Sequence, residues 1–399
     1  MNIIFVCQRF YKTNPTSLCV WAVVKKLVEL GHKCRIVTAS GVVFDSCKSN
    51  ELKNSSDLEP EKNVGRVKRV FNYISFYRTW PYEGEMFNEN LYQQTKSEID
   101  KLTPDVIITP YNYLDSVVVG HKIKEEYGTK ILFIPYFLDG LLAGPSMWLM
   151  SKSEHDKRAI AVENQILSNA DAIVMMKSAK TKYEKEKGNL NFCNKIVYLD
   201  LPLYEPRNSN SARSIFPSDQ IILFFAGSMP KHIRNPKFFL QVFNGIKVPN
   251  IHFYIAGSSA YSKDLHKAAK KDSRIHILGL VPHEDVCNMQ MEADVLVNIG
   301  NSLVNMMPSK VFEYMSTGKK IIMTYRLDND PSVEYMNCYG RALMIDERNS
   351  IAEAVKETQR FIQDSDVSNN SICVEKLYDN TPDSFARMVE NLYSLGHIR

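Results

Sequence analysis

The first half of the chain alternates short apolar runs with segments whose apolar residues recur at helical spacing. Residues 2–7 form a β-rich apolar run, and the apolar positions of residues 20–28 then fit one face of a helix that Pro15 can begin and Gly31 can end. Further apolar runs with strand character follow at 34–39, 106–109, 131–135, 172–176 and 196–199. This alternation predicts an open, mostly parallel α/β sheet.

A second alternation of the same kind follows the polar stretch 205–211, which has the composition of a linker. Its apolar runs lie at 221–226, 251–256, 274–278, 295–299 and 320–324. Near the end of the chain, Thr381 offers an N-cap, Pro382 a first-turn proline and Gly396 a stop for one last helix.

These patterns predict the fold class α/β, with two Rossmann-like, doubly wound domains facing each other across a cleft. We predict an N-terminal domain over residues 1–205 and a C-terminal domain over residues 206–372. The last segment, residues 373–399, is predicted to be a helix that packs back on the first domain. Ligands of such folds bind at the carboxyl ends of the strands, so the ends that face the cleft are the expected binding region.

Charge and cysteine usage narrow the class of protein. Lys and Arg total 49 and Asp and Glu total 45, and the resulting charge of +4 is too small for a protein whose main ligand is nucleic acid. No stretch approaches the roughly 20 apolar residues of a membrane span, and the run at 2–7 is too short for a signal peptide. The eight cysteines form no zinc-like spacing. We therefore expect a cytoplasmic protein with reduced thiols and no bound metal.

The sequence Pro308-Ser309-Lys310 stands where the helix after strand 295–299 is predicted to begin. Free backbone N–H groups, the Ser309 hydroxyl and the Lys310 ammonium would converge there, which suits a phosphate group. Glu313 lies one helical turn later, where its carboxylate could accept hydrogen bonds from a ribose diol. The alternative is a helix that begins with this triplet and binds nothing.

The segment 308–319, PSKVFEYMSTGK, resembles the nucleotide-sugar-binding motif of glycosyltransferases with the glycosyltransferase-B fold, of the family-four-like kind found in bacterial surface-polysaccharide synthesis. Other segments match that family in the same order: GSMPKHIRNP at 227–236, YIAGS at 254–258, ILGLVPHEDV at 277–286 and ADVLVNIG at 293–300. The resemblance covers the whole second domain, whereas the first domain matches only in its pattern of elements.

The resemblance implies a donor-binding site that begins at the first strand of the second domain. Gly227 and Ser228 would form the glycine turn beneath the donor, and Lys231 and Arg234 would be cations for its pyrophosphate. Gly257 would end the next strand in close approach to the nucleotide. The two glycines could instead be ordinary strand-end turns, and Lys231 could be a solvated surface charge.

The same comparison implies the rest of the donor site. Val281, in the turn 279–282, would hold the base through its backbone, Ser309 and Lys310 would meet the phosphates, and Glu313 would bind the ribose. The family pattern places a first glutamate eight positions before Glu313, next to the donor sugar, but this chain has Asn305 there. Asparagine carries no charge, so the sugar and the stereochemical course stay open at this point.

Departure of a nucleotide diphosphate needs stabilisation of negative charge, which fixed amides and cations can supply without a metal. The remaining requirement is a group near the acceptor hydroxyl or the sugar ring. Asp139 follows the predicted strand 131–135, and its carboxylate could be the base of an inverting reaction or could orient the acceptor in a retaining one. The alternative is a turn aspartate that only precedes Gly140.

Residues 66–82 interleave cations with aromatic side chains. Such a surface could rest on anionic lipid headgroups, in which case the acceptor would be a lipid-linked sugar. The alternative is a β-hairpin with its aromatic residues in the core. The isolated histidines His155, His232 and His283 are expected to have structural or surface roles.

Taken together, the residues and the resemblance predict a hexosyltransferase that uses a nucleotide diphosphate sugar, a UDP-sugar, and a saccharide or lipid-linked saccharide acceptor in surface-polysaccharide or capsule synthesis. The resemblance favours a retaining over an inverting course. The cysteine usage predicts a cytoplasmic protein, and residues 66–82, if they contact lipid, would place it at the inner face of the membrane. Two alternatives stay open: a nucleotide-sugar 2-epimerase on the same fold, and a non-catalytic nucleotide-sugar-binding partner.

Overall fold

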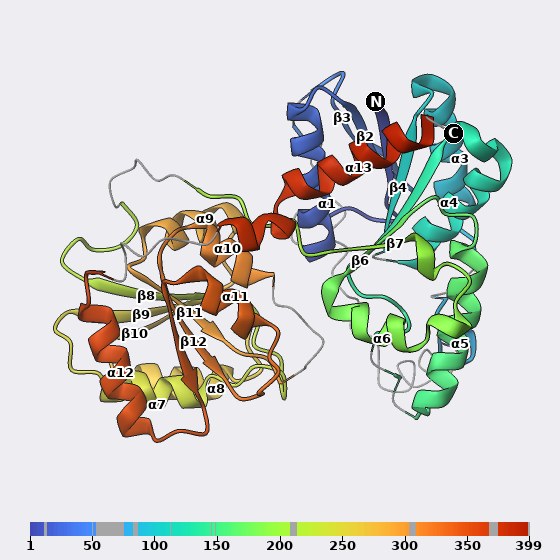
Figure 1. Ribbon diagram of the computed structural model, residues 1–399. Helices are drawn as coiled ribbons and strands as arrows, with labels where there is room; N and C mark the ends of the chain where they lie inside the picture. The colour runs from blue at the N-terminus through green and yellow to red at the C-terminus, as the bar shows by residue number, and fades with distance from the viewer. Residues whose placement is uncertain are drawn as a thin grey trace. The chain divides into compact units, whose positions relative to one another are not determined.

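The computed structural model shows a chain of two α/β units (Figure 1), Met1–Pro202 with Asp379–Arg399 and Leu203–Tyr378. It describes residues 1–11, 14–49, 51–52, 76–82, 87–111, 113–144, 146–147, 149–207, 214–302, 309–366 and 374–397. The sequence predicted domain boundaries after residues 205 and 372, whereas the two units divide after residues 202 and 378.

The first unit contains a seven-stranded sheet in the order β3-β2-β1-β4-β5-β6-β7. Its strands are β1 (Asn2–Val6), β2 (Lys33–Thr38), β3 (Gly41–Asp45), β4 (Val106–Tyr111), β5 (Leu132–Phe137), β6 (Ile173–Met176) and β7 (Ile196–Leu199). All neighbouring strands are parallel except β2 and β3. The predicted strands are all present, whereas the antiparallel edge strand β3 was not predicted.

The helices of the first unit are α1 (Pro15–Glu29), α3 (Glu89–Leu102), α4 (Leu114–Tyr127), α5 (Lys152–Leu167), α6 (Lys180–Lys185) and α13 (Pro382–His397), with short 3₁₀ turns at Gly128–Lys130, Lys177–Ala179, Lys187–Asn189 and Cys193–Lys195. Helix α1 begins at Pro15, as predicted, and the Asn14 side chain caps it by accepting a hydrogen bond from the Thr16 backbone N–H. Gly31, with φ of 87°, follows its end.

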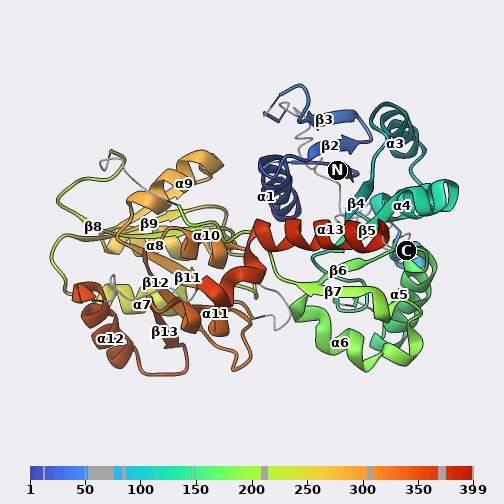
Figure 2. The same ribbon diagram turned by 45° about the horizontal axis from the view of Figure 1, so that its top comes forward.

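The C-terminal helix α13 lies beside α1 within the first unit (Figure 2). His32 Nε2 lies 3.0 Å from Glu390 Oε1, and the Tyr393 hydroxyl donates to Asp105 Oδ1 at 3.1 Å. The ring of Phe385 packs edge-on against that of Tyr136, with centroids 4.9 Å apart. Polar and aromatic contacts therefore hold the end of the chain on the unit that contains its beginning.

The second unit has a six-stranded, wholly parallel sheet in the order β10-β9-β8-β11-β12-β13. Its strands are β8 (Ile221–Ala226), β9 (Ile251–Ala256), β10 (Ile275–Gly279), β11 (Val295–Ile299), β12 (Lys320–Tyr325) and β13 (Ala342–Asp346). Its helices are α7 (Lys237–Gly245), α8 (Ser262–Lys271), α9 (His283–Glu292), α10 (Lys310–Ser316), α11 (Ser332–Tyr339) and α12 (Ile351–Gln363), and Val374–Asn380 is a 3₁₀ segment. Two Rossmann-like halves are therefore confirmed, with β13 an additional strand.

Residues 205–207, predicted to begin a linker, are tied to the second unit. The Glu205 backbone N–H donates to the Ser316 hydroxyl at 3.0 Å, and the Arg207 backbone N–H donates to the Ser316 carbonyl at 2.7 Å. The rest of the predicted linker, from residue 208 to 211, lies outside the described residues.

Residues 66–75 of the predicted lipid-contacting stretch lie outside the described residues, and residues 76–79 form a helical turn. Tyr82 is buried in the core of the first unit, and the Trp80 ring packs on that of His155 with centroids 4.6 Å apart. The described end of the stretch thus turns aromatic side chains inward. Among the helices that the structure describes, none combines the length and apolarity needed to cross a bilayer.

Candidate functional site

The strand order of the second unit reverses between β8 and β11, the point at which open α/β sheets bind ligands beyond the carboxyl ends of their strands. The backbone at this edge is unusually close-packed. A Cβ at Gly257, whose φ is 123°, would lie 2.0 Å from the Gly227 carbonyl oxygen, so only glycine fits. The Gly257 N–H also donates to the Gly279 carbonyl at 2.6 Å, which joins the ends of β9 and β10.

Arg234 spans the switch point. Its Nε donates to Asn301 Oδ1 at 2.9 Å, and its Nη1 donates to the Ser228 carbonyl at 3.3 Å. Ser228 follows β8 and Asn301 follows β11, so one guanidinium connects the two loops. Burial lowers the pKa of Arg234, although a guanidinium stays charged at neutral pH.

A carboxylate that the sequence did not single out lies near this guanidinium. Asp330 is 4% exposed, and its Oδ1 accepts from the Ser332 backbone N–H at 2.9 Å, while its Oδ2 has no hydrogen-bond partner among the residues that the structure describes. Burial raises its pKa, and the hydrogen bonds from Ser332 and the nearby charge of Arg234 oppose the rise. The only local signal was the Asp-Pro-Ser sequence before α11, which reads as a helix start.

Lys310 and Glu313 lie together at the beginning of α10. The Lys310 Nζ and Glu313 Oε2 are 2.8 Å apart, and Glu313 is only 4% exposed. The next residue, Tyr314, fixes the helix to the end of β8, because its hydroxyl accepts from the Ala226 N–H at 2.8 Å and donates to the Ala226 carbonyl at 3.2 Å. Ser309 precedes the helix and makes no side-chain cap.

Helix α9 presents a second polar group to the same region. The Cys287 Sγ lies 3.6 Å from His283 Nε2. Hydrogen bonding to Cys287 raises the pKa of His283, which the negative charge of Glu313 also favours. Burial acts to raise the pKa of Cys287, but the His283 hydrogen bond and the charges of Arg207 and His283 outweigh it, and the pKa is lowered. The sequence assigned His283 a structural or surface role and did not single out Cys287.

The remaining predicted donor-site residues are placed as follows. Ser228 and Lys231 are exposed, and the Lys231 ammonium has no partner among the described residues. Val281 lies in the turn between β10 and α9, directly before Pro282, the N-cap residue of that helix. Asn305 lies outside the described residues. The predicted set therefore surrounds the carboxyl ends of β8, β9 and β10 and the start of α10.

Asp139, the predicted catalytic residue, belongs to the first unit and follows β5. Its side chain is exposed and makes no hydrogen bond or ion pair with the described residues. The surrounding protein nevertheless desolvates the carboxyl enough to raise its pKa. A free carboxyl with a raised pKa at a strand end can exchange a proton with a ligand.

In the part of the chain that the structure describes, no three His, Cys, Asp or Glu side chains are grouped so as to hold a metal ion. The positive charge at the candidate site comes from Arg234, Lys310 and Lys231.

Part of the second unit is similar to a known protein family. Residues 220–364 match the sequence model of the family Glycosyl transferases group 1. This segment contains the described candidate donor site except Arg207, whereas Asp139 lies in the first unit. No curated protein matches the chain.

Solved structures of the glycosyltransferase-B kind share the fold over nearly the whole chain. A glycosyltransferase from Rickettsia africae superposes with a TM-score of 0.61 at 14% identity, covering 99% of this chain and 98% of that one. Anabaena HepE in complex with UDP gives 0.58 at 11% identity, covering 99% and 100%. The lipopolysaccharide outer core galactosyltransferase WaaB, in its apo form, gives 0.51 at 12% identity, covering 98% and 100%.

Proposed function

We propose that the protein is a hexosyltransferase that moves a sugar from a nucleotide diphosphate donor, a UDP-sugar, to a saccharide or lipid-linked saccharide acceptor. The observation that carries the proposal is that one segment both matches a glycosyltransferase family and contains the charged residues of the candidate site. Residues 220–364 match a glycosyltransferase family, and the same residues gather Arg234, Lys310 and Glu313 around the switch point of the sheet. The motif resemblance at 308–319 extends the proposal to surface-polysaccharide synthesis.

The described residues suit a sugar nucleotide chemically. Arg234 and Lys310, with the exposed Lys231, supply positive charge for a pyrophosphate whose negative charge grows as the glycosidic bond breaks. The Glu313 carboxylate is held in place by Lys310 and can accept hydrogen bonds from two adjacent hydroxyls, as a ribose presents. Because side-chain cations can provide this stabilisation, we propose a reaction that proceeds without a bound metal.

Asp139 is the proposed catalytic residue. Its carboxyl, which has no partner among the described residues, can accept the acceptor's proton in an inverting reaction, or can orient the acceptor while the leaving phosphate takes the proton in a retaining one. We propose the retaining course, following the motif resemblance. The raised pKa of Asp139 moves its carboxyl towards the range in which it works as an acid or base at neutral pH.

The proposal is tested by turnover of the full chain with a panel of UDP- and GDP-sugars and oligosaccharide acceptors, measuring release of nucleotide diphosphate. We expect one UDP-sugar to be consumed, loss of at least a hundredfold in turnover in Asp139→Asn, and nucleotide binding unchanged in that variant. An NMR assignment of the product's anomeric configuration decides between the retaining and inverting courses. Interconversion of the donor without transfer would show the epimerase alternative, and binding with no turnover of any donor would show the non-catalytic one.

A further inference from the structure

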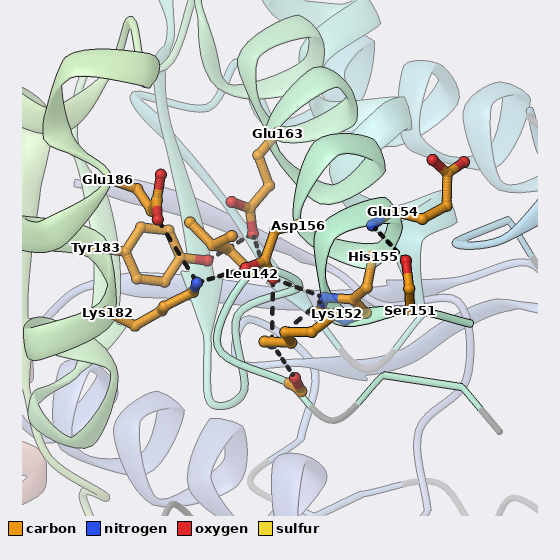
Figure 3. Close-up of polar contacts among 11 residues, drawn as sticks. Leu142, Ser151, Lys152, Glu154, His155, Asp156, Glu163, Lys182, Tyr183 and Glu186 are labelled. Atoms are coloured by element: carbon orange, nitrogen blue, oxygen red, sulfur yellow. Dashed lines mark hydrogen bonds and ion pairs between the residues drawn. The ribbon is translucent and has the colours of Figure 1, made fainter. Parts of the chain in front are cut away.

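Glu163 is a fully buried carboxyl in the first unit that the proposed reaction does not use. It lies on α5 with 0% exposure. Its Oε1 accepts a hydrogen bond from the Tyr183 hydroxyl at 2.6 Å and another from the Leu142 backbone N–H at 3.4 Å, as Figure 3 shows. Its Oε2 has no hydrogen-bond partner in the described part of the chain. Burial of a carboxyl with only one hydrogen-bonded oxygen lowers the stability of the fold. An apolar side chain of similar size at this position would give a more stable core.

The backbone group that Glu163 binds belongs to the turn that follows Asp139. Leu142 lies three residues after Asp139, and the backbone of the neighbouring Leu141 acts to lower the pKa of the Glu163 carboxyl. The turn closes on itself, because the Gly144 N–H donates to the Gly140 carbonyl at 2.9 Å. The buried carboxylate therefore anchors the first residues after Asp139 to α5.

Tyr183 fixes the same turn from the other side. A Cβ placed on Gly140 would lie 2.2 Å from the Tyr183 hydroxyl oxygen, so this hydroxyl lies directly against the backbone of the residue next to Asp139. Tyr183 lies on α6 and is itself fully buried. One hydroxyl thus both packs on Gly140 and hydrogen-bonds to Glu163.

The two helices that carry this pair are tied by a separate ion pair nearer the surface. Lys182 Nζ on α6 lies 2.6 Å from Asp156 Oδ2 on α5, and Figure 3 shows both side chains beside the Glu163–Tyr183 pair. Asp156 also lies 3.1 Å from the Lys152 Nζ. Lys152 also donates to the Gly144 carbonyl in the turn at 3.5 Å, whereas the Lys182–Asp156 pair joins the two helices directly. Because that pair joins the helices, the packing of α5 on α6 does not require a carboxylate at position 163.

We propose that Glu163 is a positioning residue for Asp139: through the Leu142 N–H and the Tyr183 hydroxyl, it fixes the turn 139–144 so that the Asp139 carboxyl stays free and directed outward. The inference rests on the proposed function, because it assigns Glu163 a role only through the reaction of Asp139. No bond is made or broken at Glu163 itself.

The first arm of the test is structural and does not need a substrate. Amide hydrogen exchange is measured in the full chain for the peptide that spans residues 138–144. We expect at least tenfold faster exchange in Glu163→Ala and in Tyr183→Phe, but near-wild-type exchange in Glu163→Gln, whose amide oxygen can still accept from Leu142. Lys182→Met is the matched control, since it breaks the α5–α6 ion pair and leaves the turn's anchors intact.

The second arm is kinetic and uses the donor identified in the turnover panel. We expect Glu163→Ala to lower kcat by tenfold or more with donor KM within twofold, Glu163→Gln to restore most of the loss, and Asp139→Asn combined with Glu163→Ala to be no slower than Asp139→Asn alone. If the two losses in kcat do not combine, Glu163 acts through Asp139. If Glu163 had only a general structural role, the fold-losses of the two single variants would multiply in the double variant.

The outcomes separate the two claims. A wild-type protein that turns over no donor would overturn the proposed function and, with it, the role of Asp139. An active wild type whose Glu163→Ala variant shows unchanged exchange in 138–144, unchanged kcat, or losses that multiply with those of Asp139→Asn would overturn the positioning role alone.

Discussion

The Nε atom of Arg234 donates a hydrogen bond to Asn301 Oδ1 at 2.9 Å, and this bond joins the loops that follow β8 and β11. The Ser302 N–H donates to the Ile233 carbonyl at 2.9 Å and joins the same loops through their backbones. These bonds fix the two loops relative to each other at the switch point. The Arg234 Nη2 has no partner among the described residues and can meet a ligand.

Replacing Arg234 by Met should weaken binding of a nucleoside diphosphate. A hydrogen bond to a charged group contributes about 1.5–3 kcal/mol, so we expect a loss of roughly tenfold to a hundredfold in affinity. Arg234→Lys should recover little, because an ammonium cannot bridge both loops. Isothermal titration with UDP measures the change. The control is Lys237→Met, which breaks only the surface pair between Lys237 and Asp264, 3.4 Å apart; equal losses in both variants would contradict a specific role for Arg234.

Gly257→Ala should destabilise the second unit strongly. The added Cβ would meet the Gly227 carbonyl oxygen at 2.0 Å, and φ of 123° is unfavourable for alanine. We expect a loss of more than about 3 kcal/mol in the free energy of unfolding, measured by urea titration. Gly279→Ala is the comparison, since its φ is 70° but nothing lies within 4 Å of its Cβ. It should lose only about 1–2 kcal/mol, and a similar loss in both variants would show that close approach is not the cause.

Cys287 should react with iodoacetamide faster than an ordinary thiol at pH 7, because its pKa is lowered and more of it is thiolate. His283→Asn removes the hydrogen bond that favours the thiolate, so the pH profile of alkylation should move to higher pH. Peptide mass spectrometry can follow the reaction, with the exposed Cys47 as an internal reference thiol. UDP should protect Cys287 and leave Cys47 unaffected; protection of neither would place the nucleotide away from α9.

The stability of the first unit should depend on pH through Glu163. Burial raises the pKa of this carboxyl from 4.5 to about 7. A carboxyl whose pKa is raised by folding holds its proton more tightly in the folded state. Its contribution to the free energy of unfolding is therefore largest below pH 4.5 and declines as the pH rises to about 7. Above that pH the contribution no longer changes. Over that range we expect the wild type to lose roughly 3 kcal/mol relative to Glu163→Gln, which cannot titrate. Urea unfolding at pH 5 and 8 measures the difference, and parallel pH dependences would contradict it.

The sequence predicted the fold well where apolar runs were bounded by turn residues. The strands at 221–226, 251–256 and 295–299 have the predicted bounds, because each is a mostly apolar run that lies largely buried in a parallel sheet. Strand β3 was missed because it is an antiparallel edge, and such a strand is fixed by its partner β2 more than by its own sequence.

The candidate site was predictable only where a motif carried it. Lys310 and Glu313 were found because they lie one turn apart in the sequence. Asp330 was missed because it approaches Arg234 only through the tertiary fold, and Glu163 was missed because its sequence context is that of an ordinary helix. In the first unit, Gln8 Nε2 donates to Asp115 Oδ2 at 2.7 Å next to the switch between β1 and β4, and no local signal joins these two residues either.

The most direct test of the account is a calorimetric titration of the full chain with UDP, carried out on the wild type, Glu313→Ala and Asp272→Ala. The Asp272 variant is the matched control, because it breaks an ion pair with Arg274 of 2.7 Å in the same unit, before β10 and away from the strands' carboxyl ends. We predict binding of one UDP per chain in the wild type and the control, and at least tenfold weaker binding in Glu313→Ala. Absence of binding in the wild type, or equal binding in all three, would contradict a nucleotide-sugar site at the β8–β11 switch point.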